Sequence, residues 1–184
     1  MAAQRLDYIL ITSSHDTRFS GQRGISGYLG FGTNLGDRKQ NLAQAINRLN
    51  DRPDFAIIRT SNIYETEPWG VTNQPNFLNM VAEITTSLDP HQLLERIKKL
   101  EKDMGREGGP RYGPRLIDID ILLLQDLVVD YPDLQVPHAS LHLRAFALVP
   151  LSELTPDSIH PVLGETISQL TKRVDGLDGI TPII

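Results

Sequence analysis

Two aspartates that flank a single isoleucine, Asp118 and Asp120, carry the strongest chemical signal in the sequence. They lie in the apolar segment 116–124, whose composition is typical of a buried strand. Side chains two apart in a strand point to the same side, with Cα atoms about 6.5 Å apart, so both carboxylates face one way. Two such carboxylates repel each other, and burying them is costly unless cations compensate the charge. Two Mg²⁺ ions about 3.5–4 Å apart, bound also to a polyphosphate, would supply that compensation. The alternative is a structural ion pair with Arg111 or Arg115.

The segment that precedes this strand is rich in arginine. Arg106, Arg111 and Arg115 all lie within twelve residues of Asp118, and Gly and Pro lie between them. Guanidinium groups neutralise charge on transferring phosphoryl oxygens and on a leaving group. We therefore expect a lid-like loop over residues 106–114 beside the carboxylates. The alternative is a solvated loop whose arginines only aid solubility.

A second group of residues suits a flat ligand. In the alternating segment 77–87, Phe77 and Asn79 share one face. Phe77 offers a ring for stacking, and Asn79 offers both a hydrogen-bond donor and an acceptor. Thr66, Trp69 and Tyr112 would add polar and aromatic walls, so the group suits a heterocycle with an amide-like edge. For each aromatic residue taken alone, core packing is the simpler interpretation.

Other motifs are weaker or absent. Gly30, Gly32 and Gly36 have one residue too many for the G-x-G-x-x-G dinucleotide fingerprint, and no G-x-x-x-x-G-K-[ST] phosphate loop occurs. His138 and His142 are four residues apart, but without an obvious third ligand they make a poor zinc site. The sequence has no cysteine and no G-x-S-x-G, which excludes cysteine catalysis and a nucleophile elbow.

Composition limits the class of protein. The 184 residues carry a formal net charge of -5, which argues against a general nucleic-acid binder. No apolar run approaches the roughly 18 residues needed to cross a bilayer. Residues 1–26 do not match a secretory signal, and Asp7 and Asp16 argue against a transit peptide, so we expect a poorly ordered N-terminal extension. We therefore expect one cytoplasmic domain over residues 27–184.

The elements that must position these residues follow from the apolar periodicity. Helices are predicted over 37–50 and 90–104, the second with Asp89 as N-cap and Gly105 as stop. Strands are predicted over 28–31, 55–67, 77–87 and 116–124. A hairpin near 128–134 and helices over 144–154 and 165–174 follow. The order β-α-β-β-α-β predicts an α+β, ferredoxin-like fold, with two helices on one face of an antiparallel sheet and C-terminal additions.

Several separated motifs then form a pattern. Tyr112–Leu122 (YGPRLIDIDIL) lies downstream of Gly32–Asp37, of residues 64–70 and of residues 74–79, and Val136–His138 with Arg144-x-Phe146 follows. In this order the motifs resemble those of the 6-hydroxymethyl-7,8-dihydropterin pyrophosphokinase family of folate synthesis, over roughly residues 27–160. The resemblance implies transfer of the β,γ-pyrophosphoryl group of ATP to the hydroxymethyl oxygen of the pterin, with release of AMP.

The resemblance also implies a role for each candidate residue. Asp118 and Asp120 would hold two Mg²⁺ ions, and Arg106 and Arg115 would clamp the phosphates and act in catalysis. The pterin-binding residues would be Thr66, Trp69, Phe77, Asn79, Tyr112 and Phe146. The ATP-binding residues would be Glu101, Arg106, Arg115, Ile121, His138 and Arg144. We expect a monomer or weak homodimer with no nucleic-acid or membrane partner.

The sequence departs from the family pattern near the nucleotide. The loop 106–111 is slightly shorter than usual, Gly108 stands where a basic residue is common, and Tyr112 replaces a Trp. An aromatic residue, a basic residue and a hydroxyl are replaced, respectively, by Ala139, Asp133 and Gln135. Two other functions stay open at this point, namely an ordinary kinase that moves one phosphoryl group and a catalytically inert ligand sensor.

Overall fold

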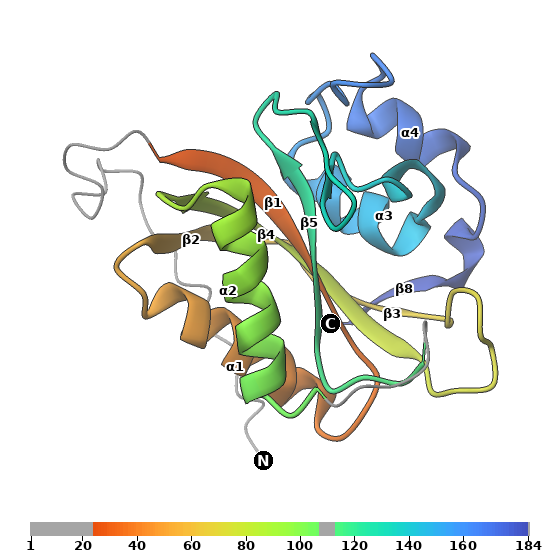
Figure 1. Ribbon diagram of the computed structural model, residues 1–184. Helices are drawn as coiled ribbons and strands as arrows, with labels where there is room; N and C mark the ends of the chain where they lie inside the picture. Colours follow the sequence, from red (N-terminus) through yellow and green to blue (C-terminus); the bar gives the residue numbers. More distant parts are fainter. Residues whose placement is uncertain (1–23, 107–112, 184) are drawn as a thin grey trace.

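The computed structural model describes residues 24–106 and 113–183 (Figure 1). The first part of the chain follows the predicted order of elements. These are β1 (Ile25–Thr33), α1 (Arg38–Asn50), β2 (Phe55–Thr60), β3 (Ile63–Thr66), β4 (Phe77–Thr86), α2 (Pro90–Asp103) and β5 (Asp118–Leu124). The C-terminal part adds a short hairpin, helices and a last strand. These are β6 (Val129–Asp130), β7 (Gln135–Val136), the 3₁₀ turns η2 (Leu141–Leu143) and η3 (Leu177–Gly179), α3 (Ala145–Leu154), α4 (Ile167–Arg173) and β8 (Ile180–Ile183).

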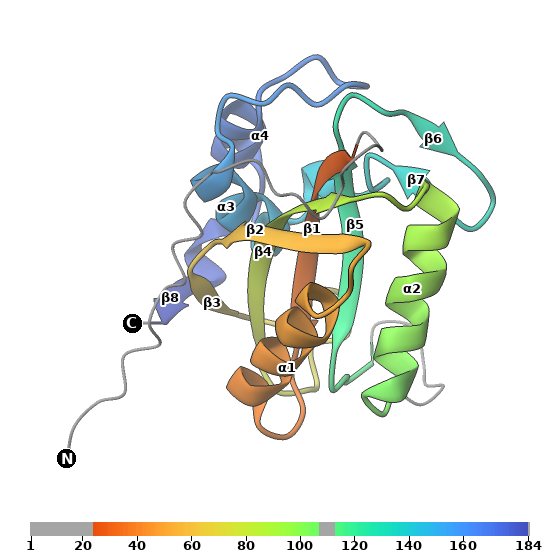
Figure 2. The same cartoon turned by 90° about the vertical axis from the view of Figure 1, so that its left-hand side faces the viewer.

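The central sheet, within the described residues, has six antiparallel strands. Its order is β5-β1-β4-β3-β8, and β2 pairs with β4 beyond the end of β3. Helices α1 and α2 lie on one face of the sheet, and α3 and α4 lie on the other (Figures 1 and 2). The ferredoxin-like prediction is confirmed, because the two outer strands of the β-α-β-β-α-β unit flank the central pair β1 and β4.

Strand alternation fills two hydrophobic cores, one on each side of the sheet. Leu78, Met80 and Ile84 of β4 pack in the core under α1 and α2. Val81, which points the other way, packs with Leu148 and other residues of α3. The alternation predicted from the sequence is therefore confirmed. On the sheet face that α3 covers, polar side chains lie near the starts of β4 and β5 instead of core residues.

The helix ends are set by local chemistry. Asp37 caps α1 by accepting a hydrogen bond from the backbone N–H of Gln40. Asp89 caps α2 in the same way, and Gln92 reaches back to the Asp89 backbone to complete a capping box. The predicted stop after α2 is confirmed, because Gly105 adopts a left-handed backbone with φ 92° and so turns the chain toward the arginine-bearing segment.

Two parts of the sheet differ from the sequence prediction. The single strand predicted over 55–67 was wrong, because the chain breaks at Ser61 into β2 and β3, which pair with different parts of β4. The side-chain oxygen of Ser61 accepts the backbone N–H of Val81, and this bond satisfies a donor that the break would otherwise leave unpaired. The strand β8 was not predicted at all, and it extends the sheet beyond β3.

The predicted start of the domain can be compared with the start of β1. β1 begins at Ile25, two residues before the predicted start of the domain at Gly27, and it is longer than the strand predicted over 28–31. Residues 1–23 lie outside the described residues, so the N-terminal extension stays a prediction. Within the described part of the chain, no helix is both long and apolar enough to cross a membrane.

Candidate active site

The sheet register brings the predicted ligand-binding residues into adjacent rows. Gly32 of β1 pairs with Asn79 of β4 on one side and with Asp118 of β5 on the other. One step along, Gly30 pairs in the same way with Val81 and with Asp120. Paired residues in neighbouring strands point to the same face, so the amide of Asn79 and both carboxylates project from one face of the sheet. The glycines between them add no side chain to that surface.

Gly32 is a close-approach glycine rather than part of a dinucleotide motif. A Cβ atom built on Gly32 would lie 2.8 Å from the side-chain oxygen of Asn79, which is closer than real Cβ atoms come. Glycine inside a strand often marks a place where a side chain or ligand approaches the backbone. The Gly30-x-Gly32 pair carries this signal in the sequence, and a comparison with the dinucleotide fingerprint alone does not detect it.

Arginines from three separate segments neutralise the two aspartates. Arg115 lies 2.6 Å from one carboxylate oxygen of Asp118, and Arg106 lies 2.9 Å from the other. Arg144, at the start of α3, lies 2.7 Å from Asp120. The ion pair between Arg115 and Asp118, which the sequence offered as the alternative to a metal site, is therefore present in the structure.

Glu101 lies behind the aspartates rather than among the residues that line the pocket. Its side chain is 1% exposed, and it accepts a hydrogen bond of 2.8 Å from the backbone N–H of Ile119, the residue between the two aspartates. It also pairs with Lys98 and with Arg106. Burial raises the pKa of Glu101, and the charges of Lys98 and Arg106 oppose that rise. Glu101 thus ties α2 and Arg106 to the backbone of the acidic strand.

His138 faces the second aspartate as a neutral imidazole. Burial lowers its pKa, although the charge of Asp120 acts in the opposite direction. The Nδ1 atom accepts a hydrogen bond from the backbone N–H of Ser140, which leaves the proton on Nε2. Nε2 lies 3.9 Å from Asp120, so the imidazole directs an N–H donor into the carboxylate region.

The opposite end of the site is a polar and aromatic wall. The amide of Asn79 donates a hydrogen bond of 2.7 Å to the hydroxyl of Thr66, and both side chains are buried. Arg144 stacks over the rings of Trp69 and Phe146, at 5.2 and 5.6 Å from their centroids. The Nε atom of Arg144 is buried and has no hydrogen-bond partner among the described residues, so Arg144 has a donor free for a ligand.

Asn34 joins the two halves of the site, and the sequence analysis missed it. Its side-chain oxygen accepts the backbone N–H of Arg115 at 2.7 Å. Its amide donates to the side chain of Gln74 and to the carbonyl of Pro75, each at 3.0 Å. Asn34 is 3% exposed, and it therefore couples the segment of Arg115 to the loop that follows Trp69.

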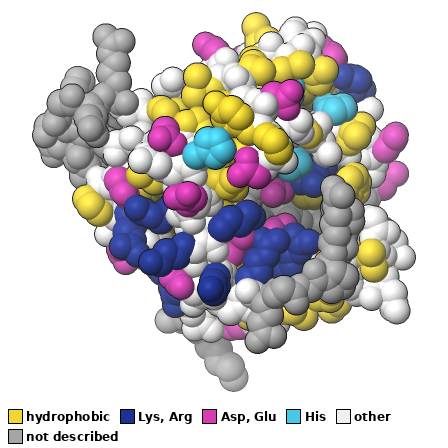
Figure 3. Space-filling model, in the orientation of Figure 1, with side chains coloured by type: hydrophobic (Ala, Val, Ile, Leu, Met, Phe, Trp, Pro, Cys, Tyr) yellow, Lys and Arg dark blue, Asp and Glu magenta, His cyan; other side chains and the backbone are white. Residues whose placement is uncertain are grey.

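One open pocket of 860 Å³ joins the carboxylates to the polar and aromatic wall. All of the described residues assigned to ligands from the sequence line it except Glu101. Tyr112, and the Arg111 and Gly108 of the lid-like loop, lie outside the described residues. Lys98, the two strand glycines and Asp133 with Gln135 also line the pocket. On the face drawn in Figure 3, Lys and Arg side chains gather over and beside α2, although the chain is acidic overall.

Comparison with known proteins agrees with this geometry. Residues 28–156 match the family model of 7,8-dihydro-6-hydroxymethylpterin-pyrophosphokinase (HPPK). A 2-amino-4-hydroxy-6-hydroxymethyldihydropteridine pyrophosphokinase of Aquifex aeolicus is 44% identical over 142 residues, covering 77% of this chain and 88% of the relative. The protein of the same name from Methylorubrum extorquens is 41% identical over 148 residues, covering 80% of this chain and 92% of the relative.

A solved structure supports the fold. The Plasmodium falciparum HPPK-DHPS A437G with SDX-DHP superposes with a TM-score of 0.71 at 18% identity. The match covers 91% of this chain but 51% of that protein, so the chain spans about half of it. Because the family model matches most of the chain and bacterial relatives match nearly end to end, the chain belongs to the 7,8-dihydro-6-hydroxymethylpterin-pyrophosphokinase family.

Proposed function

We infer that the protein transfers the pyrophosphoryl group of ATP to 6-hydroxymethyl-7,8-dihydropterin in folate biosynthesis. The hydroxymethyl oxygen attacks the β-phosphorus, the bond between the α,β-bridging oxygen and that phosphorus breaks, and AMP leaves. The attacking hydroxyl loses its proton, and the products are AMP and the pterin diphosphate. A single observation supports the site assignment most strongly. Gly32 pairs with Asn79 on one side and with Asp118 on the other, so an amide and a carboxylate lie on the same face of the sheet with a glycine between them.

The pterin is proposed to bind at the polar and aromatic wall. Asn79, held in orientation by Thr66, would exchange hydrogen bonds with the amide-like edge of the ring. Phe77, Trp69 and Phe146, with Tyr112, would enclose the ring faces. From there the hydroxymethyl arm would reach toward Asp118 and Asp120, which line the same pocket as the wall.

The residues at the other end fit Mg²⁺. Within the described residues, no cluster of three or more His, Cys, Asp or Glu could hold a metal. The carboxylates of Asp118 and Asp120 project from one face of β5 and are the pair placed to share an ion. Mg²⁺ at nucleotide sites is commonly held by one or two carboxylates and completes its octahedron with phosphate oxygens and water. We propose that Asp118 and Asp120 hold two Mg²⁺ ions, which would neutralise phosphate charge and orient the reacting groups.

The arginines must change partners for this to happen. In the structure Arg106 and Arg115 pair with Asp118, and Arg144 pairs with Asp120. When a polyphosphate enters, its oxygens offer these guanidinium groups new partners and free the carboxylates. Arg106 and Arg115 then act on charge that develops as AMP departs, while Ile121, His138 and Arg144 complete the ATP site. Glu101, which the resemblance assigned to ATP, would act from behind the pocket by holding Arg106. Catalysis here needs positioning and charge neutralisation, and no covalent nucleophile is proposed.

The location, the oligomeric state and the partners of the protein are also proposals. We propose a cytoplasmic monomer or weak homodimer that acts on small molecules, with neither nucleic acid nor membrane as a partner. The net charge of -5 supports this, because a general binder of nucleic acid or of an anionic membrane surface would carry excess positive charge.

The nucleotide product tests the proposed function. The purified full chain is incubated with ATP, Mg²⁺ and 6-hydroxymethyl-7,8-dihydropterin, and the nucleotides are separated by chromatography. We expect AMP in a one-to-one ratio with the pterin diphosphate, and no AMP when the pterin is left out. ADP would instead indicate an ordinary kinase, and the absence of turnover would indicate a ligand sensor.

A further inference from the structure

The last strand of the chain lies outside the region that the family model matches. That match ends at residue 156, whereas β8 spans Ile180–Ile183. β8 pairs antiparallel with β3 and so lies beside the strand that carries Thr66 (Figure 1). A segment beyond the shared family region thus contacts an element of the proposed pterin site.

Without β8, β3 would be a short and weakly held edge strand. β3 has four residues, and only Tyr64, Glu65 and Thr66 are paired with β4. β8 pairs with all four, from Ile63 opposite Ile183 to Thr66 opposite Ile180. Strands with few backbone partners open locally at low free-energy cost. β8 therefore holds the second side of β3 along its whole length.

β8 is itself anchored in both hydrophobic cores. Ile180 packs against the core on the α3 side of the sheet, and Ile183 packs against the core on the α1 side. These two residues lie at the two ends of the strand, so β8 is held at both ends. An anchored strand transmits this restraint to the neighbour with which it is paired.

The restraint reaches the ligand-binding residues directly. Ile180 is opposite Thr66, whose hydroxyl accepts the hydrogen bond from Asn79. A Cβ atom on Gly179 would lie 3.7 Å from Glu67, the residue that follows β3 and lines the pocket, so the backbone that leads into β8 also packs on the start of the loop. That loop continues to Trp69, which stacks with Arg144.

We propose that β8 is a positioning element of the pterin-binding wall, and that Thr181, at its centre, is a positioning residue that acts through the backbone of β3. This inference rests on the proposed pterin site. β8 would hold Thr66 and the start of the following loop in place, so that Asn79 and Trp69 meet the ring in one arrangement. The acidic strand β5 lies at the other edge of the sheet and is not paired with β3 or β8, so Asp118 and Asp120 would keep their positions.

The test disrupts β8 within the full chain. Thr181→Pro removes a backbone donor from a strand in which Pro182 already has none, and Thr181→Val is the matched control because Thr181 is exposed and valine suits a strand. Trp69 is the only tryptophan in the chain, so acrylamide quenching of its fluorescence reports on the loop without any substrate. We expect faster quenching in Thr181→Pro and wild-type quenching in Thr181→Val.

Steady-state kinetics supply the second readout. We expect the KM for the pterin to rise roughly tenfold to a hundredfold in Thr181→Pro, because misplacing a binding wall weakens positioning of that substrate. The KM for ATP should rise much less and kcat should stay unchanged, because the wall meets the ATP site only where Trp69 stacks with Arg144. Ile180→Ala, a milder change opposite Thr66, should shift the same constant in the same direction and serves if Thr181→Pro does not fold. Circular dichroism checks that each variant keeps its fold.

The outcomes separate the inference from the proposed function. Unchanged quenching and an unchanged pterin KM in folded variants would overturn the role of β8. A parallel loss in the kinetic constants of both substrates would also overturn it, since that pattern indicates general damage. If the wild-type protein formed no AMP, the proposed function would fail, yet the substrate-free quenching would still decide whether β8 orders the loop.

Discussion

At the scale of single residues, the site pairs carboxylates with arginines in two groups. Arg106 contacts both Glu101 and Asp118, and Asp118 also pairs with Arg115. Arg144 pairs separately with Asp120. An unpaired carboxylate in such a partly buried place would be costly, so the arginines stabilise the folded site. The same contacts keep the guanidinium groups from a phosphate, which makes each carboxylate a competitor of the polyphosphate.

Replacing one carboxylate separates its contribution to turnover from its competition with the polyphosphate for the arginines. In Asp118→Asn we expect turnover to fall by about a hundredfold to a thousandfold, because transition-state charge loses its support. We also expect metal-free tripolyphosphate to bind more tightly, by about tenfold, because Arg106 and Arg115 lose a charged competitor. Calorimetric titration with tripolyphosphate in the presence of a chelator measures the second effect.

Asp126→Asn is the matched control, since Asp126 is exposed in the turn after β5 and does not line the pocket. It should change neither turnover nor tripolyphosphate binding. If Asp118→Asn bound metal-free tripolyphosphate as weakly as the wild type does, the carboxylate would not compete with the polyphosphate for the arginines. The proposal that the arginines exchange partners would then be wrong.

The residues that line the pocket could be predicted from the sequence, whereas the ion pairs among them could not. Strand alternation fixed the side on which Asp118, Asp120 and Asn79 project, and the pocket contains all three. The pairing of each arginine depends on where three separate segments converge in space, and no local pattern encodes that. The place of Glu101 behind the strand, rather than in the pocket, depends in the same way on how α2 packs on β5.

At the scale of elements, the junction between β2 and β3 decides how the pterin wall meets the sheet. Ser61, at the break, is 3% exposed. Its backbone N–H donates to the carbonyl of Val81, and its hydroxyl accepts the N–H of Val81 and donates to the carbonyl of Asn62. One serine therefore replaces the ladder bonds that the break removes.

Ser61→Ala should destabilise the protein, because it leaves the buried N–H of Val81 without an acceptor. We expect the free energy of unfolding to fall by about 1–3 kcal/mol, measured by urea titration. Ser26→Ala, at an exposed position of β1, serves as the control and should stay within about 0.5 kcal/mol of the wild type. Equal stabilities of the two variants would show that another acceptor takes the N–H of Val81.

The two long helices were predicted closely from the sequence, whereas the last strand and the break between β2 and β3 were not. Both α1 and α2 have apolar stripes and capping residues, so their ends could be placed within two residues. β8 has four residues and a proline, which gives no period to recognise. The break at Ser61 lies in a run of β-forming residues, and only its pairing with two different parts of β4 reveals it.

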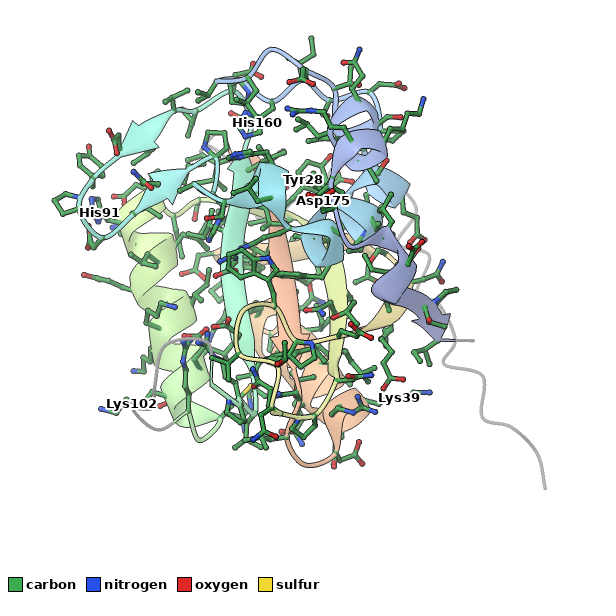
Figure 4. All side chains as sticks on the ribbon, turned by 90° about the vertical axis from the view of Figure 1, so that its right-hand side faces the viewer. Tyr28, Lys39, His91, Lys102, His160 and Asp175 are labelled. Carbon is green, nitrogen blue, oxygen red and sulfur yellow. The ribbon has the colours of Figure 1, made fainter. Side chains whose placement is uncertain are left out.

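At the scale of the whole molecule, the protein is a three-layer structure in which the C-terminal region covers the second face of the sheet. The hydrophobic core on that side joins β4 and β5 to α3 and α4. The chain between those two helices is closed by a turn around His160, which Figure 4 places at the opposite end of the molecule from Lys39 and Lys102. The stability of this layer can therefore be tested by substitutions that leave the candidate active site unchanged.

His160 makes that stability depend on pH. Its side chain is buried, and its Nδ1 atom faces the backbone N–H groups of Val162 and Leu163 at 3.3 Å each. Burial is the main cause that lowers its pKa below the usual 6.5, and the nearby His142 lowers it further. The unfolded chain, in which this histidine has its ordinary pKa, therefore binds a proton more readily than the folded one. The contribution of His160 to stability is complete above about pH 6.5 and is lost as the pH falls below that value.

His160→Asn keeps an acceptor for the turn but does not titrate. We expect the Tm of the wild type to fall more steeply than that of His160→Asn between about pH 7.5 and about pH 5.5, as measured by calorimetry. His138, whose pKa burial also lowers, is present in both proteins, so its effect cancels in the comparison. His91→Asn, which changes an exposed histidine at the start of α2, should follow the wild-type slope. Parallel curves for the wild type and His160→Asn would show that the buried turn takes up a proton at no cost to the fold.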